Sequence, residues 1–441
     1  MGQVSGDVPF WNREIETLDR ERLWALQLER LRATVDQAMK THFYERRLQK
    51  LGITSGADIR SLEDLQRMPF TTKDDLRKNF PRGLLAVGFE EVVRLHSSSG
   101  TTGIPTVIYL TRSDLERWTD LVARCITATG CTRRDVFQNM MSYGLFTGGL
   151  GLHYGAERVG MMVIPIGGGN TERQVRTMRD FGTTVVHVTP SYLLHIHSKL
   201  GEYGVTSKDL SLKKAFLGAE PYSETTRKKL EDLFGIDAYN SYGLSEMNGP
   251  GVAFECVFKD DMHVWEDCYI VEIIDPATGD PVPDGQKGEV VFTILCRDAM
   301  PLLRYRTRDL AFLHAEPCRC GRTSRRLSRM LGRTDDMLII NGVNVFPSQI
   351  EEVIMSIPDV GTNYLIYVDR AGVLDRLTVK VEIYSKMFTG DLAVIEGLKN
   401  RIRDKLRASM TINAVVELHE PGALPVSEGK AKRVVDVREK L

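Results

Sequence analysis

A dense run of hydroxyl-bearing residues and glycines is the first stretch of this sequence whose composition points to chemistry. In chain order the run consists of Ser97, Ser98, Ser99, Gly100, Thr101, Thr102 and Gly103. Such residues cannot form an apolar core, but their hydroxyls and backbone N–H groups can surround an anion, and glycines let the main chain approach it closely. A flexible hairpin loop is the alternative interpretation, because short motifs often match by chance. The strand-like runs on both sides and the density of hydroxyls favour a phosphate-binding loop.

Two commoner nucleotide-binding motifs do not match. The nearest approach to a Walker-type loop has Leu424 where the first glycine is required and Ala431 after the lysine. The glycine-rich segment 149–154 ends on Tyr154, where a dinucleotide fingerprint has its third glycine. Neither a P-loop NTPase nor a Rossmann dehydrogenase is therefore favoured.

Cysteines and a histidine offer a possible metal site. Cys318 and Cys320 lie in one polar loop, and Cys256 and His263 lie upstream. Together they form a Cys₃His set, which is complete for a tetrahedral structural zinc ion. Two exposed thiols with a buried Cys256 are the alternative, and Cys268 competes with Cys256 for the third thiolate position. We expect one structural Zn²⁺ per chain, bound by Cys256, His263, Cys318 and Cys320.

Bulk composition excludes several classes of protein. The chain has 441 residues, enough for two or three domains, with 42% hydrophobic and 27% charged residues. A net charge of −1 gives no reason to expect a nucleic-acid or anionic-membrane partner. No apolar run reaches the length of a bilayer span, and no signal peptide is visible at the N-terminus. The seven cysteines are too sparse for a disulfide framework, so we expect a cytoplasmic protein.

Alternating apolar runs and amphipathic stretches predict the elements that position these residues. Residues 21–50 carry a helical pattern. Strands are predicted at 92–95, 106–110, 161–166, 184–188, 214–217 and 236–239. Helices are predicted at 113–129, 171–181, 191–200 and 223–234. Such alternation is typical of a largely parallel, helix-covered sheet, and residues 271–274 and 288–295 are expected to form an antiparallel hairpin.

The pattern restarts after Gly332 and predicts a second domain. Strands are predicted at 337–340, 364–368, 377–383 and 415–418, and helices at 347–355 and 392–408. We therefore expect an α/β protein with a large N-terminal domain, residues 1–332, whose sheets are mainly parallel and covered by helices. A small α+β domain, residues 333–441, would follow it.

Taken in order, the hydroxyl-rich loop and five later segments resemble the adenylate-forming (ANL) superfamily, and within it the phenylacetate–CoA ligases. The segments are 218–221, 240–246, 304–309, 332–340 and 427–432. The resemblance extends from about Trp11 to the end of the chain. It implies an AMP-forming acid–thiol ligase that uses ATP, Mg²⁺ and coenzyme A, and it also implies a homodimer.

The resemblance assigns the nucleotide contacts. Its adenine-side turn corresponds to Gly218, Ala219, Glu220 and Pro221. Tyr242 would lie against adenine, Ser245 would meet the α-phosphate and Glu246 would help to hold Mg²⁺, which prefers carboxylate and phosphate oxygens. Asp309 would accept hydrogen bonds from both ribose hydroxyls, a role that suits an acceptor-only carboxylate.

The resemblance also assigns the moving parts. Arg333 would contact ribose or phosphate, and Asp335 would absorb the backbone rotation at the hinge between the domains. Gly342 and Asn344 suit a tight turn before the helix that starts at Pro347. Lys430 would enter the site only during adenylation, when its ammonium neutralises charge on the reacting phosphate.

The acid pocket is expected in the glycine- and aromatic-rich segment 142–151, which lines it in phenylacetate–CoA ligases. Tyr143 and Phe146 are the candidates for contact with an aryl ring, and simple core residues are the alternative. Residues 139–142 differ from the tyrosine-containing version of that family, so an indole acid or a hydroxyphenylacetate remains open besides phenylacetate. The structural or pocket-lining histidines are expected to be His153, His187, His195 and His197.

Rival functions follow from the same fold, because fold does not fix function. An enzyme resembling coenzyme F390 synthetase would transfer its nucleotidyl group to another acceptor. A non-catalytic nucleotide- or CoA-binding regulator is the other class. Glu246, Asp309 and Lys430 together argue against a regulator, which would not need a lysine loop. The expected partners are therefore small molecules: an aryl acid, ATP and CoA.

Overall fold

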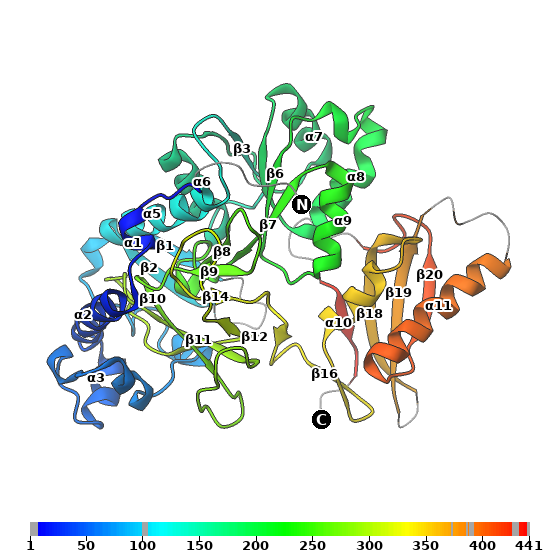
Figure 1. Cartoon of the computed structure of the whole chain (residues 1–441). Helices are drawn as coiled ribbons and strands as arrows, with labels where there is room; N and C mark the ends of the chain where they lie inside the picture. The colour runs from blue at the N-terminus through cyan, green and yellow to red at the C-terminus, as the bar shows by residue number, and fades with distance from the viewer. Residues whose placement is uncertain are drawn as a thin grey trace. The chain divides into compact units, whose positions relative to one another are not determined.

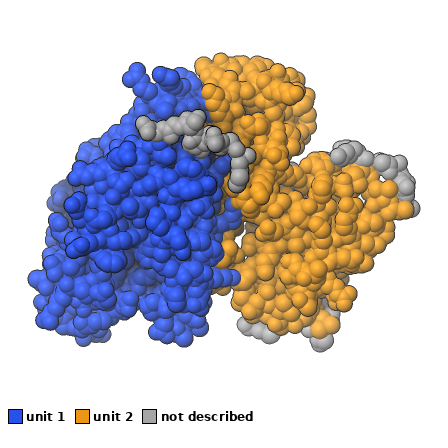
Figure 2. All heavy atoms as spheres, viewed as in Figure 1, with its two compact units in different colours: residues 1–167, 184–187, 239–329 blue, residues 168–183, 188–238, 330–441 orange. Residues whose placement is uncertain are grey.

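The computed structural model describes most of the chain as two compact units. The described residues are 8–98, 105–371, 374–384, 387, 392–425 and 432–438. The first unit comprises residues 1–167, 184–187 and 239–329, and the second comprises residues 168–183, 188–238 and 330–441 (Figure 2). One boundary between the units thus falls between residues 329 and 330, near the boundary expected at 332/333. The second unit also includes residues 168–183 and 188–238, which the sequence analysis assigned to the N-terminal domain. No helix of the described ranges is long and apolar enough to cross a bilayer.

The helices of the first unit are distributed along its N-terminal half (Figure 1). They are α1 (Arg13–Glu16), α2 (Arg20–Ala38), α3 (His42–Gln49), α4 (Lys73–Lys78), α5 (Arg112–Ala128) and α6 (Thr147–Val159). Short 3₁₀ turns are η1 (Gly56–Asp58), η2 (Leu62–Arg67), η3 (Phe89–Glu91) and η6 (Ser245–Met247). The pattern over residues 21–50 is therefore two helices rather than one. The break occurs because the side chain of Thr41 caps α3 by accepting from the Tyr44 N–H.

Helix α6 was not predicted, because four glycines lower the helix propensity of its sequence. Packing against α5 explains them. A Cβ atom at Gly151 would come within 2.6 Å of the Trp118 ring, and one at Gly155 within 2.4 Å of Val122. The glycines therefore let two helices approach closely, and this tertiary contact outweighs the local preference.

The strands of the first unit form both parallel and antiparallel sheets. They are β1 (Val92–Ser97), β2 (Val107–Thr111), β3 (Val136–Asn139), β4 (Met162–Ile164), β5 (Val185–Val188), β7 (Asp237–Tyr242), β8 (Ala253–Glu255), β9 (Met262–Val264), β10 (Tyr269–Ile274), β11 (Gly288–Ile294), β12 (Tyr305–Ala311), β13 (Leu313–His314) and β14 (Arg326–Leu327). Strand β3 pairs in parallel with β4 and β5, as the α/β pattern predicts. The run β7-β8-β9-β14-β13 is antiparallel and was not predicted, because most of its strands have only two or three residues.

Two further antiparallel pairings occur in this unit, and the second of them was predicted from sequence. Strands β1 and β2 flank the hydroxyl-rich loop. Strands β10 and β11 form the expected hairpin, and β12 pairs with β11 on its other side. Ser97 at the start of the loop and Asp309 thus each lie in a strand, and strands hold side chains more rigidly than long loops do.

The second unit combines three stretches of the chain. Its elements are α7 (Thr171–Asp180), α8 (Pro190–Lys199), η4 (Leu200–Tyr203), η5 (Ser207–Asp209), β6 (Lys214–Leu217), α9 (Glu224–Phe234), β15 (Gly332–Arg333), β16 (Leu338–Ile340), β17 (Val343–Val345), α10 (Pro347–Met355), β18 (Val360–Ala371), β19 (Leu374–Ile383), α11 (Leu392–Met410), β20 (Val415–His419) and β21 (Val434–Asp436). The sheet has the order β20-β19-β18-β21, and α10 and α11 contribute to a common apolar core with it.

The hairpin of β16 and β17 corrects one expectation of the sequence analysis. Its two connecting residues are Asn341 and Gly342, which have φ of 48° and 83°. Positive φ at both positions is the geometry of a type I′ turn, for which Asn-Gly is the preferred pair. Gly342 thus lies in the predicted turn, whereas Asn344 lies in β17.

Candidate active site and metal centre

Tyr242 and Asp309 meet in the first unit. Tyr242 ends β7, and its hydroxyl donates to Oδ2 of Asp309 on β12 at 2.6 Å. Both side chains are buried. Arg308 has a backbone φ of 69°, which residues other than glycine rarely adopt. The Asp309 N–H donates to Thr307 Oγ1. The expected adenine-side aromatic and ribose-binding carboxylate are therefore side by side and held by the backbone.

The hydroxyl-rich loop and Glu246 are linked through Thr106. The Ser98 N–H donates to the Thr106 carbonyl, and the hydroxyls of the two residues lie 2.5 Å apart. The Thr106 hydroxyl in turn donates to Glu246 Oε1 at 3.3 Å, and both residues are buried. The described ends of the loop thus reach the carboxylate expected to hold Mg²⁺. Thr106 was not among the expected site residues, although it stands directly beyond the loop.

Ser245 contacts the segment expected to bind the acid. Its hydroxyl lies 3.1 Å from that of Thr147, the first residue of α6. Ser245 and Thr147 are both buried. The expected α-phosphate contact is therefore adjacent to the start of the helix that follows the aromatic segment, and adenylation requires a phosphate and a carboxylate to meet.

The two aromatic candidates of that segment differ in environment. Phe146 precedes α6 and is 40% exposed, so it is not an ordinary core residue. Tyr143 is half-buried, and burial raises its pKa to about 12. Its hydroxyl contacts Asn139 Nδ2 at 3.0 Å and His153 Nδ1 at 3.1 Å. Sequence patterns gave no role to Asn139, and its position at the end of β3 was the only available signal.

The turn at residues 218–221 belongs to the second unit. Ala219 has a φ of 67°, an unusual conformation for a residue with a Cβ atom. Glu220 accepts a 2.7 Å hydrogen bond at Oε1 from the N–H of Ser191, in the first turn of α8. A carboxylate is favourable at this position because it satisfies an unpaired backbone donor and the positive end of the helix dipole. The Glu220 side chain thus has a structural partner, while Gly218 and Pro221 complete the turn.

The expected hinge residues also lie in the second unit and pair with each other. Arg333 donates from Nε and Nη2 to the two carboxylate oxygens of Asp335, at 2.9 and 3.0 Å. Just before them, Gly332 has a φ of 144°, and a Cβ there would lie 2.8 Å from the Phe346 ring. A glycine is therefore required where the chain enters the C-terminal part.

The remaining members of the expected nucleotide site lie outside the described residues. They are Ser99, Gly100, Thr101, Thr102, Gly103 and Lys430. Ser97 is described: it ends β1, and its N–H donates to the Leu145 carbonyl, which ties the start of the loop to the aromatic segment.

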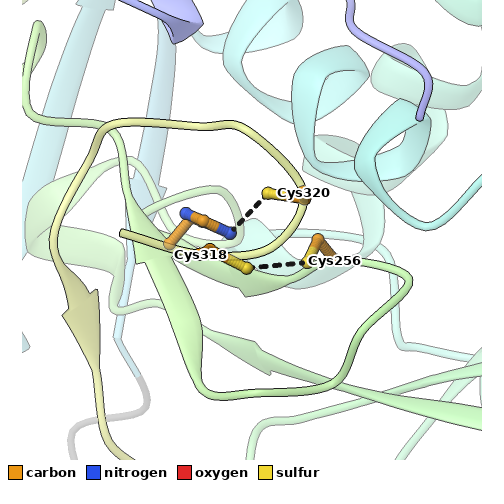
Figure 3. A group of neighbouring side chains, drawn as sticks. Cys256, Cys318 and Cys320 are labelled. Carbon is orange, nitrogen blue, oxygen red and sulfur yellow. Dashed lines mark hydrogen bonds between the residues drawn. The ribbon is translucent and has the colours of Figure 1, made fainter. Parts of the chain in front are cut away.

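Four potential metal ligands converge in the first unit, as the sequence predicted. They are Cys256, His263, Cys318 and Cys320, all buried, and their ligand atoms lie within 4.8 Å of one another. Cys256 follows β8, His263 lies in β9, and the other two lie in the loop between β13 and β14 (Figure 3). The rival Cys268 lies elsewhere, against Asp267 and Cys296.

Two distances in this cluster are close to those between the ligands of a tetrahedral zinc ion. The sulfurs of Cys256 and Cys318 are 3.8 Å apart, and the Cys320 sulfur is 3.3 Å from His263 Nε2. Tetrahedral zinc with bonds of about 2.3 Å to sulfur and 2.0 Å to nitrogen separates such ligands by about 3.8 and 3.5 Å. His263 Nδ1 lies 3.1 Å from the Ser324 hydroxyl, which orients Nε2 into the cluster. Hydrogen bonds from Cys256, Cys318 and His263 lower the pKa of Cys320 and favour its thiolate.

Family models and relatives agree on the kind of protein. Residues 53–293 match the AMP-binding enzyme family, and residues 342–438 match the AMP-binding enzyme C-terminal domain. The phenylacetate-coenzyme A ligase of Thermus thermophilus is 47% identical over 97% of this chain and 100% of its own length. That of Escherichia coli is 44% identical over 96% and 97%.

Solved structures agree as well. The 2-hydroxyisobutyryl-CoA ligase in a postadenylation state has a TM-score of 0.91 at 26% identity, and the match covers 99% of this chain and 94% of that one. The same ligase in a thioesterification state has a TM-score of 0.72 at 28% identity, over 100% and 94%. The candidate nucleotide-site residues Tyr242 and Asp309 are paired as this resemblance implies. By its relatives and family models, the chain belongs to the phenylacetate–CoA ligase family of AMP-forming, adenylate-forming enzymes.

Proposed function

We propose that this protein couples an aryl carboxylic acid, foremost phenylacetate, to coenzyme A through an acyl-adenylate, with AMP and pyrophosphate as the other products. The contact between Thr106 and Glu246 carries the proposal, because it joins the hydroxyl-rich loop to the acidic residue that the same phosphate chemistry requires. Relatives that are 44–47% identical over nearly the whole chain are phenylacetate-coenzyme A ligases.

In the first half-reaction, a carboxylate oxygen of the acid attacks the α-phosphorus of ATP. The bond from that phosphorus to the bridging oxygen breaks, and pyrophosphate leaves. The Ser/Thr-rich loop and the Lys430 ammonium offset the growing negative charge on the phosphate oxygens. Asp309, oriented by Tyr242, holds the ribose. Mg²⁺ bound at Glu246 would supply further charge neutralisation at the phosphates.

In the second half-reaction, the CoA thiol attacks the carbonyl carbon of the mixed anhydride and AMP leaves. Residues 333–441 turn about Asp335, so that Lys430 withdraws and the thiol gains access. Asp335 is exposed, and it follows Gly332, where a side chain would clash with the Phe346 ring. Both observations support this hinge. The related 2-hydroxyisobutyryl-CoA ligase has been solved in both a postadenylation and a thioesterification state.

Replacement of Lys430 separates the half-reactions. Lys430→Ala should lower ATP–pyrophosphate exchange by about 10²-fold or more, because it removes charge stabilisation from the transition state. Thioester formation from supplied acyl-adenylate and CoA should stay within about 3-fold of the unaltered protein. Equal loss in both assays would contradict alternation of the small domain.

The thiol cluster is proposed to hold one structural Zn²⁺ per chain. Its support is the donor set, its burial and two ligand distances close to those of tetrahedral zinc. The cluster uses residues of β9 and two loops, so the ion would tie together segments that lie far apart in the sequence. Metal analysis of protein purified without added zinc should find about one equivalent, and finding none would refute the site.

A cytoplasmic location and a homodimeric state complete the proposal. All seven cysteines are buried thiols without a disulfide, as in proteins of a reducing compartment. The dimer rests on family resemblance alone, and sedimentation of the purified protein measures it directly.

Release of AMP with a panel of acids is the decisive experiment. The panel contains phenylacetate, hydroxyphenylacetate, an indole acid and a fatty acid, each with and without CoA. The proposal expects CoA-dependent AMP release and a thioester with phenylacetate, and weaker activity with the fatty acid. If a thioester forms only with another aryl acid of the panel, that acid and not phenylacetate is the substrate. A stable adenylylated product would indicate an enzyme resembling coenzyme F390 synthetase, and the absence of turnover would indicate a regulator.

A further inference from the structure

The half-buried Tyr143 belongs to a continuous chain of hydrogen bonds in the first unit. The chain begins at the buried His187 on β5, passes through Asn139 on β3 and Tyr143, and reaches His153 and Glu157 on α6. Only its last member lies on the surface. From sequence, His153 and His187 are expected to be structural or pocket-lining, and the assignments above give Asn139 no function.

Asn139 has a single orientation that satisfies all its partners. Its Oδ1 accepts from the Met141 N–H at 3.3 Å, and its Nδ2 donates to the Gly149 carbonyl at 2.6 Å. A backbone N–H can only donate and a carbonyl can only accept, so the amide cannot be reversed. The second Nδ2 hydrogen points to the Tyr143 hydroxyl, and His187 Nδ1 donates to Oδ1. Burial lowers the pKa of His187 to about 3, which keeps it neutral.

The direction of the remaining bonds follows from Asn139. Because Nδ2 donates to the Tyr143 hydroxyl, that hydroxyl is available to donate to His153 Nδ1, 3.1 Å away. The other ring nitrogen of a neutral His153 then carries the hydrogen, which faces Glu157 Oε1 at 3.1 Å. With His153 in this neutral form, all donors of the chain point from the buried sheet toward the surface.

We propose that Asn139 is a positioning residue for the acid-binding site: it fixes Tyr143 through the tyrosine hydroxyl, and the fixed ring forms part of the surface that binds an aryl acid. The inference rests on the proposed function, in which segment 142–151 lines the acid site. Asn139 also ties the two ends of that segment together, since it bonds the Met141 N–H and the Gly149 carbonyl. Its influence therefore falls on the acid rather than on ATP.

Measurement of ATP–pyrophosphate exchange against both substrates tests this role. Asn139→Ala should raise KM for the aryl acid about 10-fold, because the aromatic wall is no longer held in place, and leave KM for ATP within about 2-fold. The matched control is Gln27→Ala in α2, which also removes a buried amide that donates to two backbone carbonyls. The control should leave both KM values within about 2-fold. A parallel rise of both KM values in Asn139→Ala would overturn the proposal.

A second variant removes only the hydroxyl. Tyr143→Phe should raise KM for the acid about 3- to 10-fold, and adding it to Asn139→Ala should change little further, because both act through one hydrogen bond. Effects that multiply would contradict action through Tyr143. If Asn139→Ala does not fold, Tyr143→Phe decides alone, and an unchanged KM for the acid refutes the proposal. If no aryl acid stimulates ATP–pyrophosphate exchange in the unaltered protein, the proposed function is wrong, and this inference falls with it.

Discussion

The first unit buries three thiols and an imidazole together, and the second unit buries a carboxylate among hydroxyls. In the second unit, Glu351 on α10 accepts from the Ser223 N–H at 3.1 Å and from the Thr226 hydroxyl at 2.7 Å, both at the start of α9. The Tyr364 hydroxyl contacts its other oxygen at 3.3 Å. Both clusters bring together segments far apart in sequence.

The two clusters differ in whether the protein itself satisfies their polar groups. Three donors and the N-terminus of α9 surround the Glu351 carboxyl, so its hydrogen-bonding capacity is largely met within the chain. Thiols are weak donors and weak acceptors, and three of them packed against a histidine stabilise one another poorly. A divalent cation bound between them would form a strong coordination bond with each of the four side chains. The Glu351 cluster is thus satisfied by the chain itself, whereas the thiol cluster would gain its strongest bonds from the proposed zinc ion.

Removal of a thiol should have the largest effect on stability. Cys318→Ser should abolish stoichiometric zinc and lower the free energy of unfolding by several kcal/mol, about 3 or more, because metal binding is linked to folding. Metal analysis and chemical denaturation measure the two quantities on one preparation.

The control for that variant is Cys131→Ser, which alters a buried thiol of the first unit outside the cluster. It should retain zinc and destabilise by about 1 kcal/mol. Equal destabilisation by both variants, with no zinc in either, would mean that the cluster is an ordinary buried group of thiols.

Removal of the Glu351 carboxyl should have the next largest effect. Glu351→Ala leaves the Ser223 N–H, the Thr226 hydroxyl and the Tyr364 hydroxyl without their acceptor, and we expect a loss of about 2 to 4 kcal/mol in the free energy of unfolding. The exposed neighbour on the same helix gives the control, since Glu352→Ala should change stability by less than about 0.5 kcal/mol. Similar small values for both would show that water replaces the carboxyl readily.

Sequence alone predicted the parts of the site that are encoded locally. The hydroxyl-rich loop, Tyr242 with Glu246, and Asp309 stand in short segments whose residue types carry their chemistry. The candidate metal ligands were chosen by residue type, but only the fold separates Cys256, which lies in the cluster, from Cys268, which packs against Asp267.

Residues whose role depends on distant packing were not predicted. Helix α6 is rich in glycine and forms because Trp118 and Val122 of α5 require close approach. Asn139 and Glu351 belong to no motif. Each is a polar residue that becomes buried only when other elements pack over it. Thr226, a partner of Glu351, lies 125 residues earlier in the chain. Periodicity reports the face of a helix that is buried and does not identify what covers it.

Replacement of Glu351 by its neutral isostere should have the smallest effect, and that effect should depend on pH. Burial raises the pKa of Glu351 above its ordinary value of 4.5, against the attraction of Arg433 and with the repulsion of Glu220. Its stabilising contribution is then complete below pH 4.5 and is lost as the pH rises through the folded-state pKa. Glu351→Gln cannot ionise and should not share this loss.

Denaturation at pH 5 and pH 8 measures the difference. Glu351→Gln should match the stability of the unaltered protein at pH 5 and should be the more stable of the two at pH 8. Glu352→Gln should show no such change between the two pH values, because its carboxyl is exposed. If Glu351→Gln is less stable than the unaltered protein by the same amount at both pH values, the carboxyl is ionised throughout this range. Its hydrogen bonds are then charge-assisted, and the Glu351 cluster, like the thiol cluster, depends on charge.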